Sequence, residues 1–208
     1  MSDDIVSIPA GGAPALVACG FFTPNYRPLA QRLSAELGPD NPHHFFSMDK
    51  GQASWFDIVG WKPKVIERAL DLYPNSAIVF LDMDSQVHGS LAALANINAD
   101  VSARAKTRIS SLPWRSRRKC ILVVSARVMV FKPNARVRKF LKDWHDAMAD
   151  GSYRKKDGAE LALGMVLMSS PGLTFTPIDP VFAGLEIGTA PSNAILTHIS
   201  ESEKTGRS

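Results

Sequence analysis

The sequence predicts an α/β fold in which a mostly parallel central sheet is flanked by helices. Apolar runs rich in Val, Ile and Phe, typical of buried strands, occupy residues 15–22 and 77–81. Segments with apolar residues at helical spacing lie between these runs, and such alternation predicts parallel strands covered on both faces. The 208 residues suit a single domain, 1–208, whose ends at 1–13 and 199–208 are expected to be flexible.

Periodicity and turn residues locate the other elements. Leu29, Leu33 and Leu37 share one side of a helix that begins near Tyr26 and stops at Gly38. Pro63 suits the first turn of a second helix, which ends at Tyr73-Pro74. The remaining expected elements are a strand at 43–49, a short helix at 90–97, two strands or one bent strand at 121–131, a helix at 135–148, a buried helix around 161–168 and a last strand at 194–200.

Asp82-Met83-Asp84 is the most informative motif, because it follows a predicted central strand. Alternation along a strand would point both carboxylates one way and Met83 the other. In a parallel sheet ligands bind at the carboxyl ends of the strands, where this motif falls. The two carboxylates repel each other unless a cation lies between them, and Mg²⁺ or Mn²⁺ would neutralise the pair and bridge to a diphosphate. The structural alternative is an Asp that caps the next turn beside a solvated second Asp.

Two enzyme classes place a D-x-D after an apolar strand. In phosphatases of the haloacid-dehalogenase type the first Asp, here Asp82, is the nucleophile. That type begins its chain with this strand and has Thr or Val two residues after the second Asp, whereas Val87 stands one place too late here. In the other class, the GT-A glycosyltransferases, the D-x-D strand follows the nucleotide-binding half of the chain. The order of elements in this sequence favours the second class.

A second motif lies near the end of the chain, where His198 is followed six residues later by Lys204. A His at the end of a strand can supply a third metal ligand, and the Lys can reach a phosphate. Taken with the D-x-D, this spacing favours a nucleotide-diphosphate ligand held through a metal.

Taken together, these motifs resemble the glycogenin-like and bacterial lipooligosaccharide galactosyltransferase-like branch of the GT-A glycosyltransferases, from about Ala15 to Lys204. The segment KPKVIERALDLYPNSAIVFLDMDSQV is similar to that family's helix leading into its D-x-D strand. SARVMVFKPNARVRKFLKDW is similar to its strand and following helix, and the segment 157–161 to its D-Q-x-x-L. TPIDP resembles its L-P-x-x-Y/N turn, and residues 198–204 its final H-x5-K.

The resemblance implies a metal site for Mn²⁺ or Mg²⁺ and a nucleotide-diphosphate sugar as the donor. Asp82 would contact the ribose and the metal, and Asp84 and His198 would complete the metal site. The fold implied is a single GT-A domain of the Rossmann-like, nucleotide-diphospho-sugar transferase kind. The activity implied is transfer of a hexose, from a UDP-sugar, to an acceptor that the sequence does not name.

Other residues would serve the phosphates and the sugar. The resemblance implies that Lys204, and also Lys62, hold the diphosphate, and that Asp157 faces the donor sugar or the acceptor hydroxyl as the catalytic residue. Gly158 stands where the family has Gln, and Ala126-Arg127 stands where it has a small Ser-Gly pair. These departures keep a catalytically silent nucleotide-sugar-binding domain open as an alternative.

The first strand and its loop are expected to bind the nucleotide. Cys19 to Asn25 reach the same edge of the sheet as the D-x-D. Thr23 is a candidate contact to the base, or a cap of the loop. Tyr26 is a candidate to stack on the base, or a packing residue at the start of a helix.

Several further polar residues are weighed as structural. His43, His44 and Trp61 have no partner at ligand spacing in the sequence, and Asp179 in its Pro-flanked turn is expected to bond its own backbone. Arg104 and Arg127 are either solvated or in reach of a phosphate.

Charge is distributed unevenly along the chain. No Asp or Glu occurs between Val101 and Lys142, and the basic residues are densest at 115–119. This segment is either a solvated loop followed by a basic helix face, or a surface that meets a nucleotide diphosphate, an acidic acceptor or an anionic membrane. Nucleic acid is excluded as a partner because the aromatic residues are too sparse for stacking and no nucleic-acid motif is present.

The sequence predicts a cytoplasmic protein, either free or peripheral at the inner face of the membrane. Cys19 and Cys120 lie in apolar runs and are expected to be buried thiols, which fits a reducing compartment. The start MSDDIVSIP lacks the apolar run of a signal peptide, and no apolar stretch reaches the length of about 18 residues that spans a bilayer.

Overall fold

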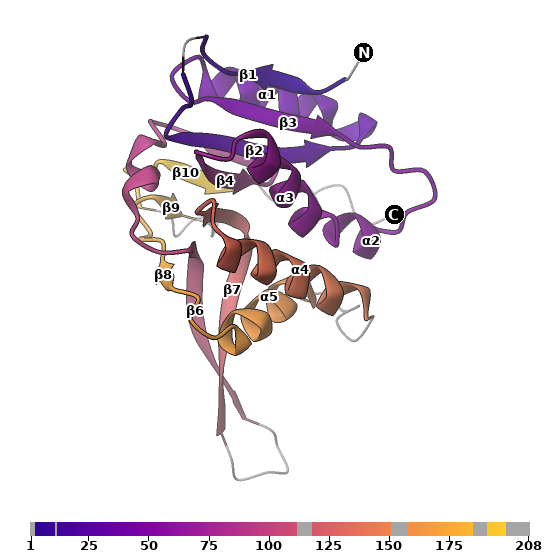
Figure 1. Ribbon diagram of the computed structural model, residues 1–208, viewed down its shortest axis with the longest axis vertical. Coiled ribbons are helices and arrows are strands. Elements are labelled where there is room, and N and C mark those ends of the chain that lie inside the picture. Colours follow the sequence, from indigo (N-terminus) through magenta and orange to yellow (C-terminus); the bar gives the residue numbers. More distant parts are fainter. Residues whose placement is uncertain (1–2, 11, 112–117, 151–157, 185–190, 199–208) are drawn as a thin grey trace.

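The computed structural model describes residues 3–10, 12–111, 118–150, 158–184 and 191–198, with the backbone alone for 106–111 and 118–122. The described strands form a seven-stranded sheet in the order β1-β3-β2-β4-β7-β6-β8 and a three-stranded sheet in the order β5-β10-β9. The large sheet consists of β1 (Ile5–Ser7), β2 (Leu16–Phe22), β3 (His43–Ser47), β4 (Ala77–Leu81), β6 (Val101–Ser111), β7 (Arg118–Phe131) and β8 (Phe175–Pro177). Figure 1 shows helices packed against this sheet, which confirms the α/β class.

The large sheet is mixed rather than mostly parallel. The expected parallel arrangement is present where β3, β2 and β4 lie side by side. Beyond β4 the sheet continues antiparallel through β7 to β6, because these two strands form a hairpin instead of strand–helix units. The chain leaves β2 toward β3 on one side and returns to β4 on the other, so the strand order reverses at β2. The carboxyl ends of β2 and β4 therefore lie where open α/β sheets generally bind their ligands.

Alternating side chains of the strands bury two cores, one on each face of the sheet. Val17 and Cys19 of β2 face a core that they share with α3 (Lys62–Leu72), α4 (Ala135–Ala149) and α5 (Gly158–Ser169). Leu16 and Ala18 face the other core, beneath α1 (Arg27–Leu37) and the short 3-10 helix η2 (Ala92–Asn96). Helices therefore cover both faces, as the alternation of elements predicted.

Most of the helices agree with their sequence signals, and the short helix expected at 90–97 is the 3-10 helix η2. Gly38 ends α1 in a left-handed conformation, φ 61°, that favours glycine, and Asn134 caps α4 by accepting from the Val137 amide. The chain also forms a short helix, α2 (Trp55–Val59), that the sequence analysis did not identify. Helix α5 was expected to be buried because it is apolar nearly all round, but Met165 and Met168 are 55% and 68% exposed.

The hairpin of β6 and β7 was not foreseen as a unit. The sequence predicted β7 from residue 121 onward, without its first three residues, and β6 contains basic residues that are not typical of a strand. Figure 1 shows the hairpin extending well beyond α5. The register of β6 and β7 shifts between Ala103 and Ala105, opposite residues 125–128, so β7 is one irregular strand rather than two.

The small sheet connects the D-x-D segment to the end of the described chain. Its strands are β5 (Ser85–Val87), β9 (Ala183–Gly184) and β10 (Leu196–His198). β10 pairs antiparallel with β5, opposing His198 to Ser85, and parallel with β9. The last predicted strand is thus confirmed, but it lies in a sheet that the sequence did not predict.

Part of the N-terminal segment, for which a flexible end was expected at 1–13, forms a strand of the large sheet. Strand β1 pairs with β3 at the edge of the sheet. Asp4 fixes it there, because its carboxylate accepts from the Ser47 amide at 2.7 Å and lies 3.1 Å from Nε2 of His44. No helix in the described residues is both long and apolar enough to cross a membrane.

Candidate functional site

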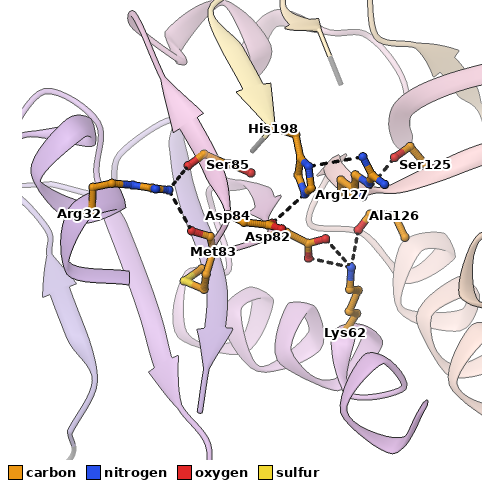
Figure 2. A network of polar contacts seen from close by, with 10 residues as sticks. All are labelled: Arg32, Lys62, Asp82, Met83, Asp84, Ser85, Ser125, Ala126, Arg127 and His198. Carbon is orange, nitrogen blue, oxygen red and sulfur yellow. Dashed lines mark hydrogen bonds and ion pairs between the residues drawn. The ribbon is translucent and has the colours of Figure 1, made fainter. Parts of the chain in front are cut away.

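The D-x-D motif lies in a tight turn at the carboxyl end of β4, not within the strand. The Asp82 amide donates to the Arg127 carbonyl at 3.0 Å, and the Ser85 amide closes the turn on the Asp82 carbonyl at 3.0 Å. Met83 is buried, as expected, while the carboxylates of Asp82 and Asp84 lie together on the other side (Figure 2). The predicted juxtaposition is therefore correct, but it is produced by the turn rather than by strand alternation.

Gly20 of β2 makes room for this turn, a role that sequence analysis missed. A Cβ atom at Gly20 would lie 2.4 Å from Cε of Met83 and 2.5 Å from the Leu81 carbonyl oxygen. The backbone of β2 and the Met83 side chain can approach this closely only because glycine has no side chain. A glycine inside the apolar run LVACGFF was the available signal for a close contact.

Lys62, the first residue of α3, neutralises Asp82. Its ammonium lies 2.7 Å and 2.9 Å from the two Asp82 carboxylate oxygens and also donates to the Ala126 carbonyl at 2.9 Å. Burial raises the pKa of Asp82 above its usual range, and the nearby Asp84 adds to this, whereas the Lys62 charge acts in the opposite direction. Lys62 thus helps to keep a carboxylate ionised in a poorly solvated place.

Asp84 is paired with His198 across the junction of the two sheets. The His198 Nε2 atom lies 2.7 Å from Asp84 Oδ1, and both side chains are nearly buried. At the other nitrogen of the His198 ring, the Arg127 guanidinium donates to Nδ1 at 3.4 Å. Because a guanidinium can only donate, Nδ1 accepts and Nε2 carries the proton that bonds Asp84 (Figure 2).

These residues form a donor set that fits a divalent cation. Asp82, Asp84 and His198 each offer one ligand atom, and these atoms lie within 4.8 Å of one another. Two carboxylate oxygens and one imidazole nitrogen suit Mn²⁺ and are compatible with Mg²⁺. A metal at Nε2 would take the place of the proton shared with Asp84. Sequence analysis named all three residues, and the structure brings them together.

The residues predicted to bind the nucleotide lie at the end of β2 and in the helical turn that follows it. Thr23 and Tyr26 follow β2 at the same edge of the sheet as the turn, and Tyr26, in the 3-10 helix η1 (Pro24–Tyr26), is 39% exposed. The Cys19 side chain, by contrast, is wholly inside the core, where burial raises the pKa of its thiol. Since successive residues of β2 face opposite sides, Cys19 packs on α3 and its thiol offers nothing to a ligand.

Other candidates divide into two groups. Asp157, Lys204 and the expected flexible segment 199–208 lie outside the described residues. Among the described ones, Asp179 accepts from the Val181 amide at 2.9 Å and Arg104 donates to the Ile178 carbonyl at 2.9 Å. Both contacts are structural, as expected for Asp179.

The predicted structural role of the two histidines is confirmed. His43 is bonded to Ser34 Oγ and the Asn41 carbonyl, and His44 lies between Asp4 and Tyr73. Trp61 packs on Phe21 with ring centroids 6.0 Å apart, which also agrees with a structural role.

Comparison with known proteins rests on structure alone, since no protein-family model and no curated protein sequence matches the chain. A glycosyltransferase involved in glycosylation of the major capsid of PBCV-1 superposes with a TM-score of 0.68 at 13% identity, covering 92% of this chain and 97% of its own. GlyE of Streptococcus pneumoniae TIGR4 superposes with TM-scores of 0.56 in its apo form and 0.51 in a second structure, at 11% and 12% identity. Those matches cover 89% and 90% of this chain, which spans about half of GlyE, 54% and 55%. The chain therefore has the α/β fold of these solved glycosyltransferases.

Proposed function

We propose that this protein is a metal-dependent glycosyltransferase of the GT-A type, in the glycogenin-like branch, that transfers a hexose from a UDP-sugar. The observation that carries the proposal is the meeting of Asp82, Asp84 and His198 at the carboxyl end of the central strand β4. A fold shared with solved glycosyltransferases supports it.

In this proposal Asp82, Asp84 and His198 hold Mn²⁺ or Mg²⁺. The bound metal supplies positive charge to the departing diphosphate, which is the main electrostatic requirement of such a transfer. The protein's own cations add to this. Lys62 fixes Asp82 and contributes an ammonium beside the diphosphate, and Arg127 orients His198 through Nδ1.

The remaining roles are assigned from the sequence. Thr23 and Tyr26 would contact the nucleoside at the edge of β2, and Lys204 would bind the diphosphate. Asp157 would face the sugar or the acceptor hydroxyl.

Metal dependence of nucleotide binding tests the proposal directly. We expect UDP to raise the melting temperature only when Mn²⁺ or Mg²⁺ is present, because the Asp82–Asp84 pair repels a diphosphate that arrives without a metal. The measurement is a thermal-shift titration of UDP and UDP-sugars with Mn²⁺ and with a chelator. Equal stabilisation by UDP in the chelator would contradict the metal site.

Turnover separates an enzyme from a silent binding domain. A transferase hydrolyses its sugar nucleotide slowly when the acceptor is missing, so Mn²⁺-dependent release of UDP from one of a panel of UDP-sugars is expected. Stabilisation by UDP and Mn²⁺ without any release would favour the silent domain.

We further propose that the acceptor side of the protein meets an anionic surface. Eight of the 24 Lys and Arg residues, and none of the 20 Asp and Glu residues, lie within positions 101–131, the β6–β7 hairpin and its connection. Such one-signed charge attracts anionic lipid headgroups or an acidic glycan by the same chemistry.

Binding assays at low and high salt test whether the basic residues of the hairpin bind an anionic surface. We expect the chain to bind phosphatidylcholine vesicles that contain phosphatidylglycerol, or an acidic polysaccharide such as alginate, and to lose this binding when Lys106, Arg108 and Lys119 are all changed to Gln. The matched control changes Lys64, Lys139 and Lys142 of α3 and α4 to Gln, which removes the same charge elsewhere. Equal losses in the two triple variants would show that the hairpin has no special part.

A further inference from the structure

The backbone of the D-x-D turn is held from behind by helix α1. The Arg32 guanidinium donates to the Ser85 carbonyl at 2.9 Å and to the Met83 carbonyl at 3.4 Å. These are the two carbonyls on either side of Asp84. In Figure 2 Arg32 approaches the turn from the side opposite to Lys62 and His198. Arg32 therefore contacts the backbone of the turn and lies on the side away from any ligand that the carboxylates bind.

Glu36, one helical turn after Arg32, holds the same strand. Its carboxylate accepts from the Val87 amide at 3.0 Å and lies 3.3 Å from Nε of Arg32. A carbonyl at Ser85 and an amide at Val87 are the groups that β5 presents along one edge, since alternate residues of a strand share an edge. β10 pairs with the other edge.

β5 is an edge strand of the small sheet, with no strand beyond it among the described residues. Arg32 and Glu36 thus take the place of a neighbouring strand: Arg32 donates to the Ser85 carbonyl of β5, and Glu36 accepts from the Val87 amide. Without them the outer edge of β5 would have to bond water or shift, because backbone polar groups in a partly buried place need partners. The bond from a charged guanidinium is among the stronger kinds of hydrogen bond.

The position of β5 determines the position of half of the candidate metal site. Asp84 directly precedes β5, and His198 stands opposite Ser85 in the pairing of β5 with β10. Asp82 belongs to the other half, because Lys62 and the Arg127 carbonyl hold it. A shift of β5 would therefore move Asp84 and His198 relative to Asp82 and change the distances among the three ligands.

We infer that Arg32, supported by Glu36, is a positioning residue that sets the geometry of the metal site through the backbone of β5. This inference rests on the proposed function, since it requires that Asp82, Asp84 and His198 bind a metal. Residues that orient metal ligands change metal affinity by about 10- to 100-fold when they are removed.

The test is a direct measurement of Mn²⁺ binding, by electron paramagnetic resonance of free Mn²⁺, with no turnover involved. We expect Arg32→Met to weaken Mn²⁺ binding by about 10-fold or more. Arg32→Lys, which keeps a cationic donor, should restore most of the affinity. The matched control is Arg27→Met, which removes an equal charge from the same helix, where Arg27 contacts Asp3 instead of β5.

The results distinguish failure of the proposed metal-dependent function from failure of the positioning role of Arg32 alone. If the wild-type protein does not bind Mn²⁺, the proposed metal-dependent function and this inference are both overturned. If the wild type binds Mn²⁺ and the Arg32→Met variant binds it equally well, only the positioning role is overturned. A fall in the melting temperature of the metal-free protein, with unchanged Mn²⁺ affinity in the folded protein, would likewise show that Arg32 serves stability alone.

Discussion

Replacing Asp84 by Asn is expected to abolish Mn²⁺-dependent release of UDP from the sugar nucleotide while the fold remains intact. The amide keeps the shape of the side chain but removes one negative charge from a donor set of two carboxylates and one imidazole. It also removes the charged partner of His198, whose Nε2 lies 2.7 Å from Asp84. We expect the loss to exceed about 100-fold, the scale seen when a group that stabilises transition-state charge is removed.

Activity, metal affinity and circular dichroism should be measured on the same preparation. The appropriate control is Asp40→Asn, which changes the same charge at an exposed position at the end of α1. Near-normal activity of the Asp84→Asn variant at low Mn²⁺ would mean that Asp84 is not a metal ligand.

A large loss of stability is expected when Asp100, just before β6, is replaced. This nearly buried carboxylate accepts two bonds from Arg136 at 2.9 Å, one from Asn134 Nδ2 at 2.8 Å and one from the Thr174 amide at 2.9 Å. It thereby ties the start of α4 and the segment before β8 to the sheet. Asp100→Ala would leave these donors without an acceptor, so we expect the free energy of unfolding to fall by about 3 kcal/mol.

Urea denaturation measures this loss, and Asp143→Ala is its control. Asp143 also forms an ion pair, with Lys139 at 2.6 Å, but on the surface of α4, where such a pair contributes less than about 1 kcal/mol. Equal effects of the two substitutions would show that the Asp100 contacts do not hold the elements together.

The stabilisation by Asp100 should also depend on pH. Hydrogen bonds from Arg136 hold the pKa of Asp100 well below its usual range. A carboxyl group with a lowered folded-state pKa stabilises the protein fully above its ordinary pKa, near about 4, and loses this contribution as the pH falls below it. The difference in unfolding free energy between the wild type and Asp100→Asn should therefore shrink below about pH 4. A constant difference down to pH 2.5 would contradict this.

Much of the first half of the chain could be predicted because its signals are local. The apolar runs of β2 and β4, the leucine spacing of α1 and its final Gly38 each specify an element without help from distant residues. The candidate metal ligands were also found from sequence, since Asp82 and Asp84 are separated by one residue and His198 follows a short apolar run.

The rest depends on contacts between distant segments that have no local signature. The basic residues of β6 hide a strand that exists because β7 pairs with it, and Arg32 looks like any helix surface residue until β5 is placed beside it. The prediction of a buried Cys19 thiol is confirmed, but the sequence did not show on which face of the sheet that thiol lies, and so Cys19 was also counted with the nucleotide-binding edge. Asp100 gave no signal at all, since its partners come from α4 and from the segment before β8.

Because β10 lies late in the chain, the candidate metal site is completed late during synthesis. Every strand of the seven-stranded sheet precedes β10 in the chain. β5 pairs with β10 only after β10 has been synthesised, because Thr197 of β10 and Gln86 of β5 are 111 residues apart in sequence. N-terminal parts of a chain generally fold first as it emerges from the ribosome. A nascent chain can thus form the first hydrophobic core, most of the second and the Asp82–Lys62 pair while Leu196 of the second core and His198 are still unmade. The candidate metal site is then among the last parts of the molecule to be assembled, after the strands of the large sheet have been synthesised.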